Sequence, residues 1–178
     1  MRYAALLRGI NVGGRKKIPM ATLRELLREL GYADVVTHLQ SGNAVFSSQR
    51  TSEDSLARAI ADRIAREFGM DVKVVIRTGS ELADVVRRSP LPGGPENPSR
   101  FFVAFLSAAP EPAAIGAMES MSFAPDQVWI SGAEAYLWCP AGAADTRLSN
   151  NFLEKRLKVT ATSRNWNTVL KLADLAGG

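Results

Sequence analysis

Residues 34–47, DVVTHLQSGNAVFS, decide the fold of this chain. Apolar and β-branched residues at 34–39 and 44–47 flank the polar turn Gln40-Ser41-Gly42-Asn43. This pattern predicts two strands joined as a β-hairpin, with Gly42 supplying the positive φ that such a turn needs. Helical patterns lie on both sides of the hairpin, so the paired strands separate two helices.

The two flanking helices carry their own boundary signals. Pro19 opens the first helix at a position where its missing N–H costs nothing, and leucines follow at helical spacing. The second helix is capped by Thr51 or Ser52 and ends at Gly69. Further short strands are predicted at 3–8 and 72–76. The resulting order, βαββαβ, is the split βαβ unit of ferredoxin-like folds.

The second half repeats this order without repeating the sequence. It follows a helix predicted over 80–88 and a segment, 89–100, that holds four prolines and two glycines. The expected strands are 101–106, 127–130, 135–139 and 159–162, and the expected helices are 112–121, 148–157 and 166–176. We therefore expect an α+β protein of two ferredoxin-like subdomains, residues 1–88 with a connecting helix and 101–178 with a terminal helix, joined by a linker at 89–100.

Composition limits the kinds of chemistry available. The 178 residues are 46% hydrophobic and 22% charged, which suits a globular core. Cys139 and His38 are each the single residue of their kind, so the chain forms no internal disulfide and offers no cysteine or histidine metal cage. We expect neither a metal nor a redox cofactor. No apolar run approaches a membrane span, so we expect a cytoplasmic protein without a membrane partner. Oligomeric state is not indicated by any pattern.

A glycine-rich segment with basic residues follows the first predicted strand. The run from Gly9 to Lys16 is spaced like a phosphate loop, but Arg15 stands at the lysine position and Lys16 at the hydroxyl position. Two interpretations stay open. Backbone amides beside the basic side chains form an anion nest, or the segment is a turn with exposed cations. The candidate ligand-binding residues here are Arg8, Asn11, Gly13, Gly14, Arg15 and Lys16.

The hairpin turn supplies a second polar cluster, with the candidates Gln40, Ser41 and Asn43. The amides of Gln40 and Asn43 can donate and accept hydrogen bonds, as base or ribose recognition requires, or they can tie down a neighbouring loop. Right-handed crossovers make the first two strands parallel, so their C-terminal ends share one edge of the sheet. We therefore expect Asn11 and Asn43 to lie on adjacent loops at that edge.

The third cluster, residues 163–168, reads Ser-Arg-Asn-Trp-Asn-Thr and precedes the last predicted helix. In one interpretation Asn165 caps that helix and Trp166 packs it onto the sheet. In the other the cluster faces a ligand together with the loop opposite, with the candidates Arg147, Asn150, Asn151, Arg164, Asn165 and Asn167. Arg147 and Arg164 would then point into one pocket, since two guanidinium groups suit a carboxylate or a phosphate.

These clusters also carry a resemblance that covers nearly the whole chain. Residues 6–14, followed by Ile18-Pro19-Met20, resemble the start of the bacterial domain-of-unknown-function family 1697 (DUF1697). Residues 40–46 and 162–169 resemble its second and last blocks. The segment 146–149, Thr-Arg-Leu-Ser, departs from the Ser-Lys-Leu-Thr usual in that family, which argues against a lysine-dependent reaction there. The resemblance implies two ferredoxin-like subdomains and no established activity, substrate or catalytic residue.

The clusters favour binding of an anionic ligand, a nucleotide or RNA, as the function. Residues 1–90 hold 15 Lys and Arg against 10 Asp and Glu, whereas residues 91–178 hold 7 against 8. Aromatic residues are only 7% of the chain, which counts against the sheet-face RNA readers that stack bases on aromatics. One alternative is an enzyme acting on a phosphorylated or carboxylated small molecule, anchored by Arg147 and Arg164. Another is a protein-interaction module. No pattern identifies a reaction.

Overall fold

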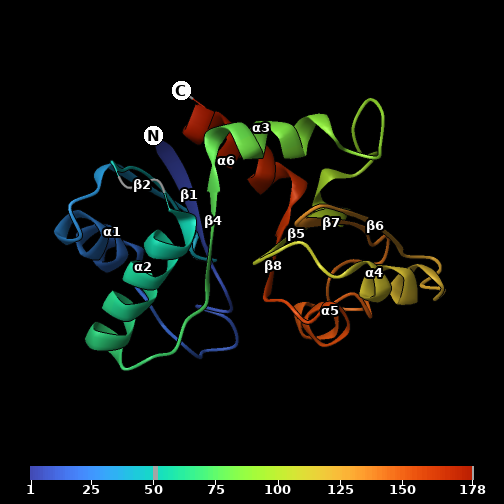
Figure 1. Ribbon diagram of the computed structural model, residues 1–178, viewed down its shortest axis with the longest axis horizontal. Coiled ribbons are helices and arrows are strands. Elements are labelled where there is room, and N and C mark those ends of the chain that lie inside the picture. Colours follow the sequence, from blue (N-terminus) through green and yellow to red (C-terminus); the bar gives the residue numbers. More distant parts are fainter. Residues whose placement is uncertain (50–51, 178) are drawn as a thin grey trace. The chain divides into compact units, whose positions relative to one another are not determined.

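The computed structural model describes residues 1–49 and 52–177 and contains two compact units (Figure 1). The first unit is Met1–Asp84 with Lys171–Gly178, and the second is Val85–Leu170. The last helix therefore contributes residues to both units, whereas the sequence places all of it in the second half. The predicted division into residues 1–88, a linker at 89–100 and residues 101–178 stays a prediction.

The first unit contains a four-stranded antiparallel sheet in the order β2-β3-β1-β4. Its elements are β1 (Arg2–Leu7), α1 (Met20–Glu29), β2 (Ala33–His38), β3 (Asn43–Ser47), α2 (Glu53–Phe68) and β4 (Val74–Thr78). Helix α3 (Gly79–Arg87) begins directly after β4. Figure 1 shows α1 and α2 together on one side of this sheet, where both helices contribute residues to a shared core with the strands.

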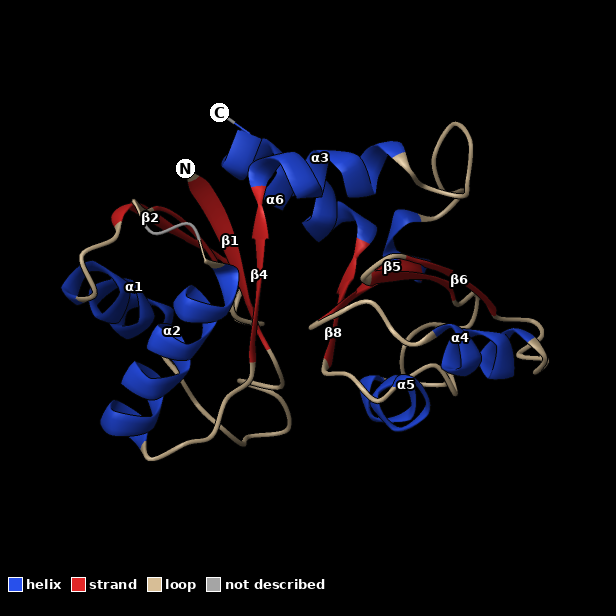
Figure 2. Cartoon of the chain, in the orientation of Figure 1, coloured by secondary structure: helices blue, strands red, loops and turns tan. Residues whose placement is uncertain are grey.

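The second unit contains a second antiparallel sheet, whose strands are drawn in red in Figure 2. Its strand order is β6-β7-β5-β8. Its elements are the 3-10 turn η1 (Pro98–Arg100), β5 (Phe101–Leu106), α4 (Pro112–Glu119), β6 (Gln127–Ser131), β7 (Glu134–Trp138), α5 (Asn150–Leu157), β8 (Ala161–Asn165) and α6 (Trp166–Gly177). Two such sheets and six α-helices in the described residues make a mixed α+β fold, which confirms the α+β class predicted from the sequence, while its ferredoxin-like subdomains stay a prediction.

Local sequence signals set the helix ends. The Ser52 side chain accepts a hydrogen bond from the Ser55 backbone N–H at 3.2 Å and so caps α2. Gly69 ends the same helix in the left-handed conformation, at φ 65°. Pro19 precedes α1 as its N-cap residue. Thr51, the other predicted cap of α2, lies outside the described residues.

The cores follow the two-residue alternation of the strands. On β1, Tyr3, Ala5 and Leu7 face α1 and α2 and are fully buried. Ala4 and Leu6 point to the opposite face and are also fully buried. A strand buried on both faces has no position that needs a polar residue, which is why residues 3–7 read as a continuous apolar run.

Two strands lie further along the chain than the sequence indicates. β4 begins at Val74 rather than residue 72, because Val74 pairs with the last residue of β1. β8 spans Ala161–Asn165 rather than 159–162, because Arg164 and Asn165 pair with the start of β5. The second shift places Arg164 inside a strand instead of in a loop. None of the helices in the described residues is long and apolar enough to cross a membrane.

Candidate functional site

The connection between β1 and α1, residues 8–19, folds as a miniature hairpin. The Arg15 backbone N–H donates to the Val12 carbonyl, and the Asn11 N–H donates to the Lys16 carbonyl, each at 3.1 Å. Gly13 and Gly14 form the tip at φ 59° and 74°, as a two-residue type I′ turn requires. The glycine pair is thus a turn. A phosphate loop would instead lead into a helix, and α1 begins only at Met20.

Asn11 fastens this hairpin to its surroundings. Its side-chain Nδ2 donates to the Ile18 carbonyl at 3.0 Å and to the Gln40 carbonyl at 2.7 Å. Its Oδ1 accepts from the Ile18 N–H at 2.8 Å. One amide therefore closes the loop and ties it to the β2–β3 turn. The predicted adjacency of the two loops is confirmed, and the Asn11 side chain acts as a clip between them.

The β2–β3 turn packs tightly under the hairpin. The Leu7 N–H donates to the Gly42 carbonyl at 2.9 Å. A Cβ added at Gly42 would lie 2.8 Å from Leu7 Cβ and from Ile10 Cδ1, so only glycine fits. Asn43 is fully buried, and its Nδ2 donates to the His38 carbonyl at 2.8 Å and to Ser41 Oγ at 3.0 Å. Of the two interpretations of Asn43, the structure supports loop-tying.

The exposed face of the hairpin is basic. Arg15, Lys16 and Lys17 are all exposed. Lys16 Nζ donates to the Asp71 carbonyl at 2.7 Å, which holds that side chain against the β4 side of the unit. A shallow depression of about 350 Å³ lies beside the hairpin, lined by Asn11, Gly14, Lys17, Ile18, Pro19 and Gln40. Lys17 is its one charged side chain, and Gln40 is exposed at the turn. Arg8 is half-buried at the base of the loop.

The predicted pocket shared by Arg147 and Arg164 is wrong. Arg164 is 6% exposed within β8, where its NH1 donates to Thr162 Oγ1 at 2.7 Å and to the Ser163 carbonyl at 2.9 Å. Burial lowers the pKa of Arg164 to about 10. Arg147 is exposed, and its guanidinium carbon lies 5.3 Å from the Phe123 ring centre. Arg164 lies in β8 on the same face as Thr162, whereas Arg147 lies in the connection between β7 and α5, over the Phe123 and Phe152 rings.

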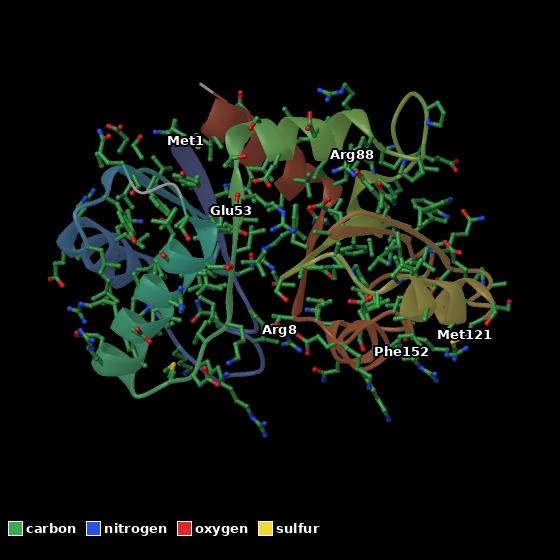
Figure 3. All side chains as sticks on the ribbon, in the orientation of Figure 1. Met1, Arg8, Glu53, Arg88, Met121 and Phe152 are labelled. Carbon is green, nitrogen blue, oxygen red and sulfur yellow. The ribbon has the colours of Figure 1, made fainter. Side chains whose placement is uncertain are left out.

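Phe152 marks the face of the second sheet that Arg147 approaches. It lies on α5 (Figure 3), packs against the core that contains Ala161, and is 5.7 Å from the Arg147 guanidinium carbon. Ala161 and Ser163 share that face of β8, whereas Thr162 and Arg164 share the other.

The other residues of the third cluster are mostly structural. The Asn165 side chain accepts from the Thr168 N–H at 3.0 Å and so caps α6. Trp166 is 5% exposed, with its ring centre 5.1 Å from that of Phe101. These contacts support the capping interpretation. Asn167 is exposed. Asn150 does meet the third cluster, because its Oδ1 accepts from Ser163 Oγ at 2.8 Å and both residues line a cleft of the second unit.

A pair of carboxyl groups in the first unit was not found from the sequence. Glu81 forms a capping box on α3, in which the Thr78 N–H donates to Glu81 Oε2 at 2.7 Å and the Glu81 N–H donates to Thr78 Oγ1 at 3.2 Å. Glu53, at the start of α2 (Figure 3), lies close enough to Glu81 for the two carboxyl groups to perturb each other's pKa. Burial first, and then Glu81, raise the pKa of Glu53 to about 7, against a lowering effect of Arg77.

The sequence Thr-Gly-Ser-Glu at 78–81 has the spacing of a capping box and could have predicted it, but nothing in the sequence places Glu53 beside Glu81. The two glutamates come from different helices and meet only through the tertiary fold. No group of three or more His, Cys, Asp or Glu side chains in residues 1–49 and 52–177 is arranged to hold a metal ion.

Comparison with known proteins gives a family and a fold. Residues 1–136 match the model of a family described as protein of unknown function (DUF1697), and the chain belongs to that family. Among solved structures it is similar to the conserved bacterial protein SP0830 from Streptococcus pneumoniae, with 24% identity and a TM-score of 0.75. The match covers 98% of each chain. No curated protein matches the sequence. Likeness at this identity shows the fold alone.

Proposed function

We propose that this member of the DUF1697 family is built from two ferredoxin-like subdomains and binds an anionic ligand, a nucleotide or RNA, at the hairpin of residues 11–17. The ferredoxin-like assignment is supported by the order βαββαβ in each unit and by the matching strand orders β2-β3-β1-β4 and β6-β7-β5-β8. The observation that carries the function is the hairpin itself, a short basic element clipped in place by Asn11.

Preorganisation is what distinguishes this hairpin from an ordinary basic surface loop. A flexible loop must lose conformational freedom when it binds, and that loss subtracts from affinity. Here the Asn11 amide and two backbone hydrogen bonds already fix the loop. The backbone that carries the Arg15 and Lys17 side chains is therefore fixed before a ligand binds. Residues 8–19 contain no Asp or Glu that could pair with these two side chains in place of a ligand.

The surroundings favour contact with phosphate rather than with base edges. The depression beside the hairpin offers Lys17 for charge and Gln40 for hydrogen bonds. Sheet-face RNA readers stack bases on exposed aromatics of the central strands. In β1 and β3 the aromatics are Tyr3 and Phe46, both fully buried. Binding should thus be electrostatic and weakly dependent on sequence.

The competing functions have less support. The enzyme alternative required Arg147 and Arg164 to bind one substrate anion together. Their contacts place the two side chains on opposite faces of the second sheet, which counts against that alternative. A protein-interaction module has no specific observation in its favour.

The salt dependence of RNA binding tests the proposal. We would measure fluorescence anisotropy of a labelled twelve-nucleotide RNA with the parent and with the double variant Arg15→Ala/Lys17→Ala, between 50 and 300 mM salt. The slope of log K against log salt should flatten by about 1.4 if both side chains contact phosphate of a single strand. Lys16 stays unchanged because it holds the Asp71 carbonyl.

The matched control removes the same charge elsewhere in the first unit. Arg58→Ala/Arg66→Ala deletes two exposed arginines of α2 and should leave the slope within error of the parent. Equal losses in both double variants would show that net charge alone attracts RNA, and the hairpin site would then be abandoned. ATP added as a competitor separates the two ligand sources. Displacement at micromolar ATP indicates a nucleotide site, and no displacement at millimolar ATP indicates an RNA backbone site.

A further inference from the structure

The second unit carries a cleft of about 210 Å³ that includes the candidate residue Asn150 but neither Arg147 nor Arg164. It lies on the face of the second sheet that also holds α4 and α5, under the connection between β7 and α5. Its walls are Phe102, Leu137, Cys139, Ala143, Thr146, Leu148, Ser149, Asn150 and Ser163.

The roof of this cleft is held by its own contacts. Thr146 Oγ1 donates to Asp126 Oδ2 at 2.5 Å and accepts from the Leu148 N–H at 3.0 Å. The Gly142 N–H donates to the Cys139 carbonyl at 2.8 Å, and a Cβ at Gly142 would collide with the Arg100 guanidinium. The loop is therefore held in place by its own hydrogen bonds, and the cleft lies beneath it.

The lining is neutral throughout. Phe102, Leu137 and Leu148 give an apolar floor, and no Lys, Arg, Asp or Glu is among the lining residues in the described chain. Burial raises the pKa of the Cys139 thiol, which keeps that wall uncharged as well. A charged ligand would lose hydration here and meet no opposite charge among the lining residues, so the cleft favours a neutral ligand.

One carboxamide at the rim is oriented for hydrogen bonding. Asn150 Oδ1 accepts from Ser163 Oγ at 2.8 Å, and Ser163 is the only partner of the Asn150 side chain within residues 1–49 and 52–177. Whichever way the amide is turned, an N–H and a carbonyl lone pair remain. A side-chain amide fixed in this way matches a planar ring edge that carries a donor next to an acceptor.

We infer that this cleft binds a nucleobase, with the ring over the Phe102 floor and its donor–acceptor edge on Asn150. Its volume falls below the roughly 300–1,000 Å³ of pockets for drug-sized ligands, so a single base fits and a larger ligand does not. The apolar floor suits the ring face, and the amide rim suits the ring edge. This inference is independent of the basic hairpin in the other unit.

Titration with nucleosides tests the inference by ¹H–¹⁵N correlation NMR of the full chain. Adenosine or cytidine should shift the amide signals of residues 146–152 and Ser163. N6,N6-dimethyladenosine and 3-methyluridine, which lack the edge donor, should bind at least about tenfold more weakly than adenosine and uridine. No shift at millimolar nucleoside, or shifts confined to other parts of the chain, would overturn the assignment.

Two variants locate the ligand and each has a neighbouring control. Asn150→Leu should weaken nucleoside binding at least about tenfold, whereas Asn151→Ala, which lies outside the cleft lining, should not. Ala143→Trp should close the cleft and abolish binding, whereas Ala144→Trp should not. Nucleoside binding that survives both cleft variants would place the ligand elsewhere. Arg15→Ala/Lys17→Ala should leave the nucleoside shifts unchanged, so failure of one proposal does not entail failure of the other.

Discussion

The two units share one strand order but elaborate different connections. In the first unit the long connection follows the first strand, from β1 to α1 at residues 8–19, whereas its counterpart from β5 to α4 spans only 107–111. In the second unit the long connection follows the third strand, from β7 to α5 at 139–149. First and third strands are antiparallel, so these loops lie at opposite edges of equivalent sheets. One topology thus carries a basic hairpin in one unit and a neutral cleft in the other.

What the units share is as informative as what they do not. Arg77 and Arg164 are the next-to-last residues of β4 and β8, and they pair with equivalent positions of β1 and β5. Each is buried, and each donates from NH1 to the carbonyl of the residue before it, at 2.8 and 2.9 Å. A repeated buried arginine belongs to the shared framework. The sites should be sought where the units differ.

The largest expected effect separates the two hairpin turns. Gly42 and Gly132 both have positive φ, 87° and 61°, but only a Cβ at Gly42 would meet other atoms. Gly42→Ala should lower the free energy of unfolding by about 3 kcal/mol, from left-handed strain plus overpacking against Leu7 and Ile10. Gly132→Ala should cost about 1 kcal/mol, from strain alone. Urea unfolding of both variants measures the difference. Similar losses would mean that the Leu7 and Ile10 side chains move aside freely.

The next effect separates the two arginines once predicted to share a pocket. Arg164→Ala should destabilise the fold by about 2 kcal/mol, because it leaves a cavity and removes the donor to Thr162 Oγ1. Arg147→Ala should cost no more than about 0.5 kcal/mol, the scale of an exposed cation–π contact. Melting temperatures of the ligand-free variants give the comparison. An unchanged melting temperature for Arg164→Ala would return that residue to the candidate ligand-binding set.

Features that depend on neighbours in sequence were the predictable ones. Ser52, Gly69 and Asn165 act at helix ends as expected, because a cap bonds to backbone within three residues. The meeting of the Asn11 loop with the hairpin turn followed from crossover handedness, which holds for almost any sequence.

Features that depend on register and tertiary contact were not predictable. Arg164 read as a loop residue because β8 was placed two residues early, and strand register decides which face a side chain takes. The interaction between Glu53 and Glu81 brings together two helices whose separation in the sequence gives no indication of it. The cleft under the β7–α5 loop combines Phe102 and Ser163 from separate strands, a grouping that only the sheet order creates.

The smallest effect concerns the helices that begin after β4 and β8. Helix α6 starts with Asn165 as cap and Thr168 three residues later, whereas α3 starts with Thr78 and the carboxylate of Glu81. The third residue after the cap is thus an acid in α3 but a threonine in α6, and in the first unit this acid, Glu81, lies near Glu53 of α2. Because the folded pKa of Glu53, about 7, exceeds its ordinary value of 4.5, the folded chain holds a proton that the unfolded chain releases. The stability from this proton is full below pH 4.5 and is lost as pH rises through 7.

Glu53→Gln keeps a neutral hydrogen-bonding group at the position, so the stability of the variant should not fall as pH rises through 7. After a discount for the solvent exposure of Glu53, the free energy of unfolding of the parent should fall by about 1 kcal/mol relative to that of the variant between pH 4.5 and 8.

Glu81 affects stability in the opposite direction. Burial of Glu81 raises its pKa, but the interactions with Thr78 and Glu53 outweigh this and leave the pKa lowered. The stability that the Glu81 carboxylate contributes is therefore lost as pH falls below 4.5. Urea unfolding at half-unit pH steps would resolve the two windows. Parallel profiles for the parent and Glu53→Gln above pH 4.5 would show that the carboxyl pair shares no proton, and the difference between α3 and α6 would then be one of capping alone.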